Sequence, residues 1–234
     1  MPDQNNRGHI SSCTISYHQC RCFDVLTKPE MELLDKHSVK MEYRKREIVF
    51  KQGGLVNNIM FVEKGLAKVY IERGDNSLVM MLVPEGNLLG LSSLSEEYNT
   101  YQFSAMTYVD SEIRQIDINV FRKFILENPV FAKEIIEKII SDNIQVYGRF
   151  FCLTHKQGFG TVADIILCLA NRIYKSMQFD LPLSRKDLAE LTGMSQETVI
   201  RILKKFAEDK LIEMDGKRFS VIDHERLTRI SETG

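Results

Sequence analysis

The stretch that most constrains the fold of this chain is Leu183–Phe206, which reads LSRKDLAELTGMSQETVIRILKKF. It predicts two short helices around a tight turn, because Ser184 and Ser195 are favoured N-cap residues and Gly193 is a turn residue. Asp187 follows the first cap at the spacing of a capping box. In the second helix the apolar residues recur at i, i+3, i+4 and i+7, which gives one buried face made of Val199, Ile202, Leu203 and Phe206.

The opposite face of this second helix is open and mostly polar; it carries Gln196, Glu197, Ile200, Arg201 and Lys204. Two capped helices with such a face indicate a helix-turn-helix, whose second helix can enter the major groove of DNA. The alternative is an ordinary helical hairpin with a solvated outer face. The turn spacing, the two caps and the clean separation of the faces favour DNA binding.

The segments on either side support the same interpretation. After Phe206, the runs Leu211–Met214 and Arg218–Ile222 flank an Asp-Gly pair, which predicts a β-hairpin. A hairpin directly after the second helix is the wing of a winged helix. Before the motif, Thr161–Lys175 predicts an amphipathic supporting helix, and the glycines of Gly158–Gly160 indicate a hinge-like break.

The first half of the chain has a different period. A short helix is expected over Lys28–Ser38, and from Lys40 to Ile118 the sequence breaks into short β-type runs separated by glycines. Short strands at regular intervals predict an antiparallel sandwich or barrel. Glu72–Ser77 suits a hairpin turn.

A long helix is expected over Pro129–Leu153, about 25 residues and roughly 37 Å. Its apolar positions recur near heptad spacing and exceed what one small β-domain covers, which favours pairing with the same helix of a second subunit. The alternative is a helix buried wholly against its own domain. The predicted dimer interface consists of Phe131, Ile135, Ile139, Val146, Phe150 and Leu153.

The N-terminal arm holds Cys13, Cys20 and Cys22, with His9 and His18 nearby. Thiolates and imidazoles at this density could bind zinc or an iron–sulfur cluster. The alternative is a flexible arm with ordinary thiols.

Composition narrows the class of protein. The formal net charge is −1, so any contact with nucleic acid must come from a local basic patch. No apolar run approaches the length of about 18 residues that spans a bilayer, and no apolar signal core begins the chain, so we expect a cytoplasmic protein that has no membrane partner. No nucleophile–base pair, phosphate loop or paired-carboxylate motif supports an enzyme.

The order of arm, β-roll, long helix and winged helix-turn-helix resembles the cyclic-AMP receptor and fumarate–nitrate reduction regulator family of bacterial transcription factors. The most specific piece is SRKDLAELTGMSQETVIRILKKFAEDKLI, in which Glu197–Leu203 matches the family's recognition helix. The resemblance implies an α+β fold with a jelly-roll-like sensor domain and a homodimer on inverted-repeat double-stranded DNA, with RNA polymerase as a partner. It divides the chain into an arm at 1–22, a cyclic-nucleotide-binding-like β-roll at 23–128, a dimerisation helix and hinge at 129–157, and the DNA-binding domain at 158–234.

The resemblance also assigns roles within the helix-turn-helix. Glu197 and Arg201 stand where the family places its base-reading residues. Gln196 stands where the cyclic-AMP-binding members carry an Arg, and Ile200 stands where the anaerobic regulators carry a Ser. Ile200 could touch a thymine methyl group but cannot donate to a base. The residues expected at DNA phosphates are Ser184, Arg185, Lys186, Ser195, Lys204, Lys217 and Arg218.

The expected effector pocket departs further from the family. Its positions are Gly86, Gly90, Leu91, Tyr101 and Gln102, and neither Leu91 nor Tyr101 supplies the cation that a cyclic phosphate needs. We therefore expect no binding of cyclic AMP, and another ligand or none in its place.

The cysteines resemble those of the iron–sulfur members, but the β-roll lacks their fourth cysteine near Glu112–Arg114. A three-thiolate site completed by His9 or His18, a haem, and direct thiol oxidation remain open. Two alternatives to a DNA regulator follow: a ligand-binding β-roll module without a DNA-reading role, and a thiol or metal redox sensor.

Overall fold

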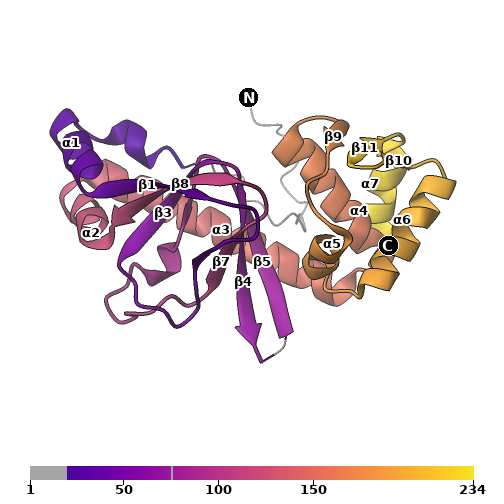
Figure 1. Cartoon of the computed structure of the whole chain (residues 1–234), viewed down its shortest axis with the longest axis horizontal. Coiled ribbons are helices and arrows are strands. Elements are labelled where there is room, and N and C mark those ends of the chain that lie inside the picture. Colours follow the sequence, from indigo (N-terminus) through magenta and orange to yellow (C-terminus); the bar gives the residue numbers. More distant parts are fainter. Residues whose placement is uncertain (1–19, 75) are drawn as a thin grey trace.

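The computed structural model describes residues 20–74 and 76–234. A β-roll and a C-terminal helical domain lie side by side, and the long helix α3 (Pro129–His155) runs from one to the other (Figure 1). This arrangement confirms the predicted α+β fold, with an antiparallel β-domain, a long helix and a C-terminal helix-turn-helix.

The β-roll consists of two four-stranded antiparallel sheets, with strand orders β1-β8-β3-β6 and β2-β7-β4-β5. Apolar side chains from both sheets alternate inward and meet in one core, which contains Met60, Val62, Val69, Val83 and Ile113. The strands are β1 (Ser38–Tyr43), β2 (Ile48–Phe50), β3 (Asn58–Lys64), β4 (Leu66–Arg73), β5 (Asn76–Pro84), β6 (Asn87–Leu89), β7 (Ser104–Thr107) and β8 (Ser111–Asp117). The expected β4–β5 hairpin is confirmed, since its last pair joins Arg73 to Asn76.

Helices close one end of the β-roll. Asn128 caps α3, because its side-chain oxygen accepts hydrogen bonds from the backbone N–H groups of Val130 at 3.1 Å and Phe131 at 3.0 Å. Phe121, Phe124 and Phe131 then pack edge to face. The elements at this end are η1 (Cys22–Val25), α1 (Lys28–Lys36), η2 (Leu91–Ser93), α2 (Ile118–Glu127) and the first turns of α3.

The C-terminal domain carries the predicted helix-turn-helix and wing. The wing sheet has the order β10-β11-β9, and its third strand, β9, was not expected from the sequence. The elements are α4 (Gly158–Cys168), its π-helical continuation η3 (Leu169–Tyr174), β9 (Gln178–Asp180), α5 (Arg185–Thr192), α6 (Gln196–Glu208), β10 (Ile212–Asp215), β11 (Arg218–Val221) and α7 (His224–Thr233).

The structure corrects the hinge expected at Gly158–Gly160, because these residues form the first turn of α4. Only Lys156 and Gln157 separate α3 from α4. A Cβ atom on Gly160 would lie 2.5 Å from the carbonyl oxygen of Gly234, so glycine permits a close approach of α4 and the C-terminal end of the chain. The glycines therefore serve helix packing, not bending.

The two domains share a buried seam. One apolar cluster runs from Leu66, Tyr70 and Val79 of the β-roll into the core of the helix-turn-helix domain. Within it Lys68 of β4, only 5% exposed, pairs with Glu190 of α5. Its ammonium nitrogen also lies 4.8 Å from the ring centroid of Tyr70, a favourable position for a buried cation.

Arg149 of α3 also joins the two domains at this seam. This side chain is 3% exposed, and its guanidinium donates to the carbonyl oxygens of Val79 at 2.6 Å and Leu191 at 2.8 Å. Burial lowers the pKa of Arg149 to about 10, so it stays a cation at neutral pH.

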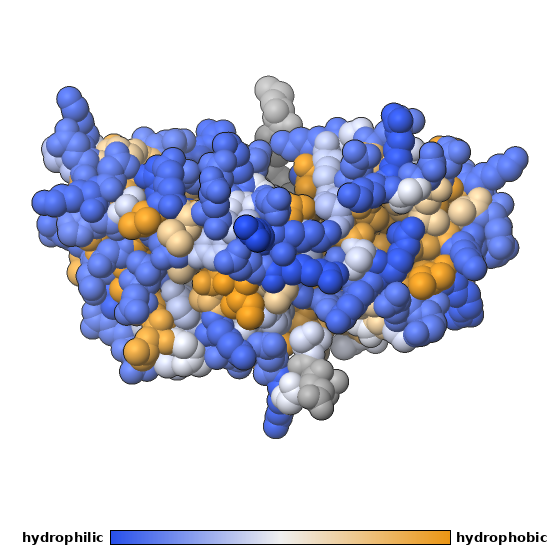
Figure 2. All heavy atoms as spheres, viewed as in Figure 1, coloured by the Kyte–Doolittle hydropathy of each residue, from blue (hydrophilic) through white to orange (hydrophobic). Residues whose placement is uncertain are grey.

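Hydrophilic side chains cover the middle of the face in Figure 2, where the two lobes meet.

We expect Lys68→Met to lower the free energy of unfolding by about 2 kcal/mol, because it leaves the Glu190 carboxylate beside aromatic rings without its partner. Urea denaturation measures the change. Lys64→Met is the matched control, since the Lys64–Glu112 pair is 70% and 42% exposed and its loss should change stability little. Equal losses in the two variants would contradict the role of the seam.

Candidate nucleic-acid interface

The predicted caps of the helix-turn-helix are present. The Ser184 hydroxyl accepts a hydrogen bond from the Asp187 N–H at 3.1 Å, and the Asp187 carboxylate accepts one from the Ser184 N–H at 2.7 Å. Ser195 caps α6 by accepting from the Thr198 N–H at 3.2 Å. Gly193 has φ of 67°, the left-handed conformation that ends α5 and starts the turn. Local sequence therefore fixes the relation of α5 to α6.

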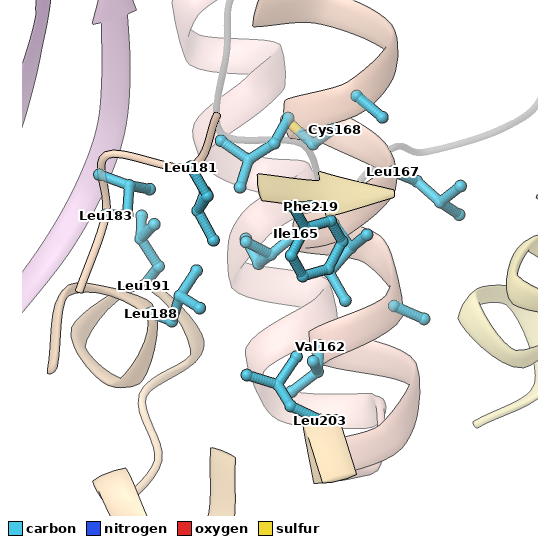
Figure 3. Close-up of a cluster of buried hydrophobic side chains, with 14 of the residues drawn as sticks. Val162, Ile165, Leu167, Cys168, Leu181, Leu183, Leu188, Leu191, Leu203 and Phe219 are labelled. Carbon is cyan, nitrogen blue, oxygen red and sulfur yellow. The ribbon is translucent and has the colours of Figure 1, made fainter. Parts of the chain in front are cut away.

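A compact apolar core holds the two helices in place. Val199, Ile202, Leu203 and Phe206 are each at most 1% exposed, which confirms the predicted inner face of α6. Figure 3 shows Leu203 beside Val162 of α4, with Phe219 of the wing and the leucines of α5 completing the cluster. The core orients α6 so that its opposite face is free.

The free face of α6 presents the predicted base-reading residues. Gln196, Glu197 and Arg201 are exposed, and Ile200 is half-buried. Hydrogen bonds from its own backbone N–H and from the Ser195 hydroxyl lower the pKa of Glu197, so this carboxylate is ionised and accepts hydrogen bonds at neutral pH. The face thus combines an acceptor, a guanidinium and an apolar side chain.

A groove of about 570 Å³ follows this face. Phe159 of α4, which sequence reasoning missed, is 38% exposed there and packs edge-on to Phe206 at 5.7 Å. The residues that line the groove are Phe159, Glu197, Ile200, Arg201, Lys204, Lys205 and Glu208. The i, i+4 spacing of Glu197 and Arg201 pointed to this surface, whereas nothing in the local pattern marked Phe159.

The residues expected at phosphates lie on α5, α6 and the wing. Lys186, Lys204, Lys217 and Arg218 are exposed, as is Ser195. Ser184 is half-buried and its hydroxyl also accepts a hydrogen bond from Arg46 of the β-roll at 3.0 Å. Arg185 is half-buried as well, and burial lowers its pKa.

The structure corrects part of the predicted dimer interface on α3. Phe131 and Ile135 are 0% and 2% exposed within the core of their own β-roll. Ile139 and Val146 line a cavity against the same domain, and Leu153 is half-buried near Gly193. Of the predicted residues only Phe150 is exposed, and the outward stripe consists of Ile136, Ile140, Ile144, Tyr147, Phe150 and Phe151.

The cavity between the β-roll and α3 measures about 300 Å³. It is lined mainly by apolar side chains, and its polar lining residues are Ser92, Asp142 and Asn143, with no cation among them. Asp142 accepts a hydrogen bond from the Lys138 ammonium at 2.6 Å. Of the predicted effector residues, Gly90 and Leu91 line this cavity.

The other predicted effector residues do not line it, because they serve the fold. Tyr101 is 5% exposed, stacks on Phe50 at 4.1 Å, and donates its hydroxyl proton to the Asn58 carbonyl oxygen at 2.7 Å. Gln102 donates to the Thr100 carbonyl oxygen at 2.9 Å. Gly86 has φ of 78° and lies in the turn between β5 and β6.

Cys20 and Cys22 are buried beside Leu34, Phe131 and Ile135. The hydrogen bond with Cys20 and burial raise the pKa of the Cys22 thiol, while the hydrogen bond from Cys22 lowers that of Cys20. Cys13, His9 and His18 lie outside the described residues. Within residues 20–74 and 76–234 no group of three or more His, Cys, Asp or Glu side chains could hold a metal ion, so the metal hypothesis stays a prediction that depends on the arm.

Two family models match the chain. The model of a Crp-like helix-turn-helix domain matches residues 162–230, and the model of a cyclic nucleotide-binding domain matches residues 40–128. They coincide with the winged domain and with the β-roll described above. In the described part of the chain, no helix is both long enough and apolar enough to cross a bilayer.

Relatives match along nearly the whole chain. "Electron transport regulator A" of Shewanella oneidensis is 24% identical over 98% of this chain and 95% of its own length. "Transcriptional activator protein Anr" of Pseudomonas protegens is 22% identical over 94% of this chain and 91% of its own. The structure of FixK2 from Bradyrhizobium japonicum superposes with a TM-score of 0.76 at 18% identity, covering 84% of this chain and 98% of that one.

The fold and the open face of α6 define a winged-helix regulator with a β-roll sensor domain. The chain belongs to the family of transcription factors that includes the cyclic-AMP receptor protein and the fumarate–nitrate reduction regulators, which confirms the family inferred from its recognition helix.

We expect iodoacetamide to alkylate Cys22 slowly in the folded protein at pH 7, because the thiolate is the reactive form and this thiol is buried with a raised pKa. Peptide mass spectrometry after timed quenching measures the rate. The same protein in urea is the reference and should react at least ~100-fold faster if access follows global unfolding. Equal rates in both states would show that the thiol pair is open.

Proposed function

We propose that the protein acts as a homodimer that binds inverted-repeat operators and reads their bases with α6. The observation that supports this proposal most directly is the two-faced structure of α6, with Glu197 and Arg201 exposed above the buried Val199 and Ile202. A helix whose inner face is fixed by a core and whose outer face carries donors and acceptors suits the major groove.

The chemistry of each side chain suggests what it contacts. Arg201 can donate two hydrogen bonds to O6 and N7 of guanine, and ionised Glu197 can accept one from the amino group of cytosine. Ile200 suits a thymine methyl group, and Gln196 suits adenine. Because Gln196 and Ile200 differ from the residues of the cyclic-AMP-binding members and the anaerobic regulators, respectively, the operator should be related to theirs without matching them.

Phosphate contacts position the helix and carry no sequence information. The exposed cations Lys186, Lys204, Lys217 and Arg218, with the capped amino ends of α5 and α6, form a basic surface around the reading helix. The net charge of the whole chain is −1, so the electrostatic attraction to DNA must come from local basic surface such as this patch.

Dimerisation is proposed along the outward stripe of α3. Ile136, Ile140 and Ile144 are 57%, 52% and 58% exposed, and Tyr147 is 70% exposed. Four large apolar side chains at spacings of three and four residues would be unfavourable in water and form the seam of a two-helix contact. A two-fold axis along this seam would relate the two α6 helices, as the two halves of an inverted repeat require.

The β-roll cavity is proposed as the sensor site. A cyclic nucleotide does not suit it, because a phosphate needs a cation and none lines the cavity. A compact, mainly apolar ligand with a hydrogen-bond donor fits the lining better. Since α3 forms one wall, such a ligand would bias the dimer helices and the spacing of the two reading helices.

The remaining parts of the proposal rest on the family. We place the protein in the cytoplasm, as a non-enzymatic regulator with RNA polymerase as a partner, because the relatives include proteins named as transcriptional activators. The functional units are the arm at 1–22, the β-roll at 23–128, the dimerisation helix and linker at 129–157, and the DNA-binding domain at 158–234.

Operators can be obtained by selecting bound duplexes from a random-sequence library. We expect Arg201→Ala to weaken binding to the selected operator by about 1–3 kcal/mol and to relax specificity at one base pair in each half-site. Fluorescence anisotropy with single-base operator variants measures both effects. Arg229→Ala on α7, also an exposed arginine, is the control and should bind as wild type. Unchanged affinity and specificity for Arg201→Ala would rule out base reading by α6.

We expect Ile140→Glu to separate the dimer. A buried isoleucine is worth about 1.5–3 kcal/mol and occurs twice in a symmetric seam, so the dimer should weaken by ~100-fold or more. Sedimentation equilibrium measures the dissociation constant. Val39→Glu, an exposed apolar position on β1, is the control and should leave the mass unchanged. A wild-type protein that is monomeric at micromolar concentration would disprove the proposed seam.

A further inference from the structure

A second groove lies where the β-roll meets the winged domain. It measures about 320 Å³ and is formed by the β1–β2 turn, the segment before α5 and the wing. Its charged lining residues are Lys45, Arg185, Lys217 and Arg218, and no acidic residue lines it. Three of these cations belong to the DNA-binding domain, while Lys45 comes from the sensor domain.

Lys45 is held in this groove from both ends. Its backbone N–H donates to the Asp110 carboxylate at 2.7 Å, and its ammonium donates to the Pro182 carbonyl oxygen at 2.6 Å. A carbonyl oxygen uses only one of the three donors of an ammonium group. The side chain is exposed, so the remaining donors and the full positive charge face the groove.

The neighbouring residue ties the same turn to the start of α5. Arg46 has φ of 67°, an uncommon conformation for a residue with a side chain. In this conformation its guanidinium donates to the Ser184 hydroxyl at 3.0 Å and to the Asp187 carboxylate at 3.2 Å. The strained turn is thus tied to the start of α5, and Lys45 lines the same groove as Arg185.

We propose that this groove binds a phosphate of the DNA backbone, and that Lys45 of the sensor domain supplies one of its cations. The inference rests on the proposed function and extends it, because the DNA contact then includes a residue outside the winged domain. The groove exists only while α5 is docked on the β-roll. Phosphate binding there stabilises the docked arrangement, which gives the sensor domain a direct influence on DNA affinity.

The test compares binding of the selected operator by wild type, Lys45→Gln and Lys45→Arg as a function of salt. Each phosphate contact contributes about 0.9 to the slope of log affinity against log salt, so Lys45→Gln should reduce the slope by about 0.9 for each protomer. The loss should be similar on operator and random duplex, because phosphates carry no sequence information. Lys45→Arg should keep the wild-type slope.

Lys51→Gln is the matched control, since Lys51 is an exposed lysine of the same domain outside the groove. A methylphosphonate scan locates the contact: neutralising one phosphate in each half-site should weaken wild type several-fold and weaken Lys45→Gln clearly less, at that phosphate alone, because only the other three cations of the groove remain. This pairing distinguishes a lost phosphate contact from an undocked domain, which would alter the response at many positions.

The outcomes separate the two proposals. If wild type binds its operator but Lys45→Gln keeps the wild-type slope and methylphosphonate profile, the groove is not a DNA site and this inference is wrong. A groove that binds only free phosphate, seen as a Lys45-dependent affinity for inorganic phosphate with an unchanged methylphosphonate profile, overturns it as well. If wild type binds no duplex, the proposed function fails and this inference with it.

Discussion

The structure depends on the docking of α5 against the β-roll. Lys68 and Arg149 are almost fully buried at this contact, and each gives hydrogen bonds to groups of α5 or of the strand that faces it. Buried cations of this kind are costly unless they are fully paired, so the domains either fit together with these contacts made or separate enough to admit water. A contact that is either fully made or broken suits a DNA-binding domain whose position is regulated.

The seam also orders the functional surfaces. The apolar cluster that it contains continues into the core behind α6, so the position of α5 on the β-roll sets the direction of the exposed face of α6. Helix α3 contributes Arg149 to the seam. It also forms one wall of the β-roll cavity and carries an exposed apolar stripe. One helix therefore touches the candidate ligand site, the candidate dimer seam and the DNA-binding domain. A rotation of α3 by a fraction of a turn would therefore move residues in all three regions.

Short-range sequence signals gave the elements and their caps with good accuracy. The helix-turn-helix is determined by local interactions, which is why it could be predicted. Ser184 with Asp187, and Ser195, cap backbone N–H groups within three residues, and Gly193 adopts the left-handed conformation of the turn. Face assignment on α3 was less successful. That helix carries apolar residues around most of its circumference, and periodicity does not say which stripe meets the chain's own domain. Phe131 and Ile135 are buried in the core of the β-roll, whereas the stripe that begins at Ile136 is exposed to solvent.

The cavity and the seam show the same limit more strongly. Tyr101 occupies a position that loop matching gave to an effector contact, yet its ring and hydroxyl are used in stacking and hydrogen bonding within the β-roll. Lys68 and Arg149 look like solvent-facing residues in the sequence, since lysine and arginine are rarely buried. The sequence by itself determined most elements, the winged helix-turn-helix and the exposed face of α6 that carries Glu197 and Arg201, because these follow from local backbone chemistry and a single helical period. Only the tertiary structure decided which face of α3 is free, where the cavity lies, and which cations join the domains, because those depend on contacts between residues far apart in the chain.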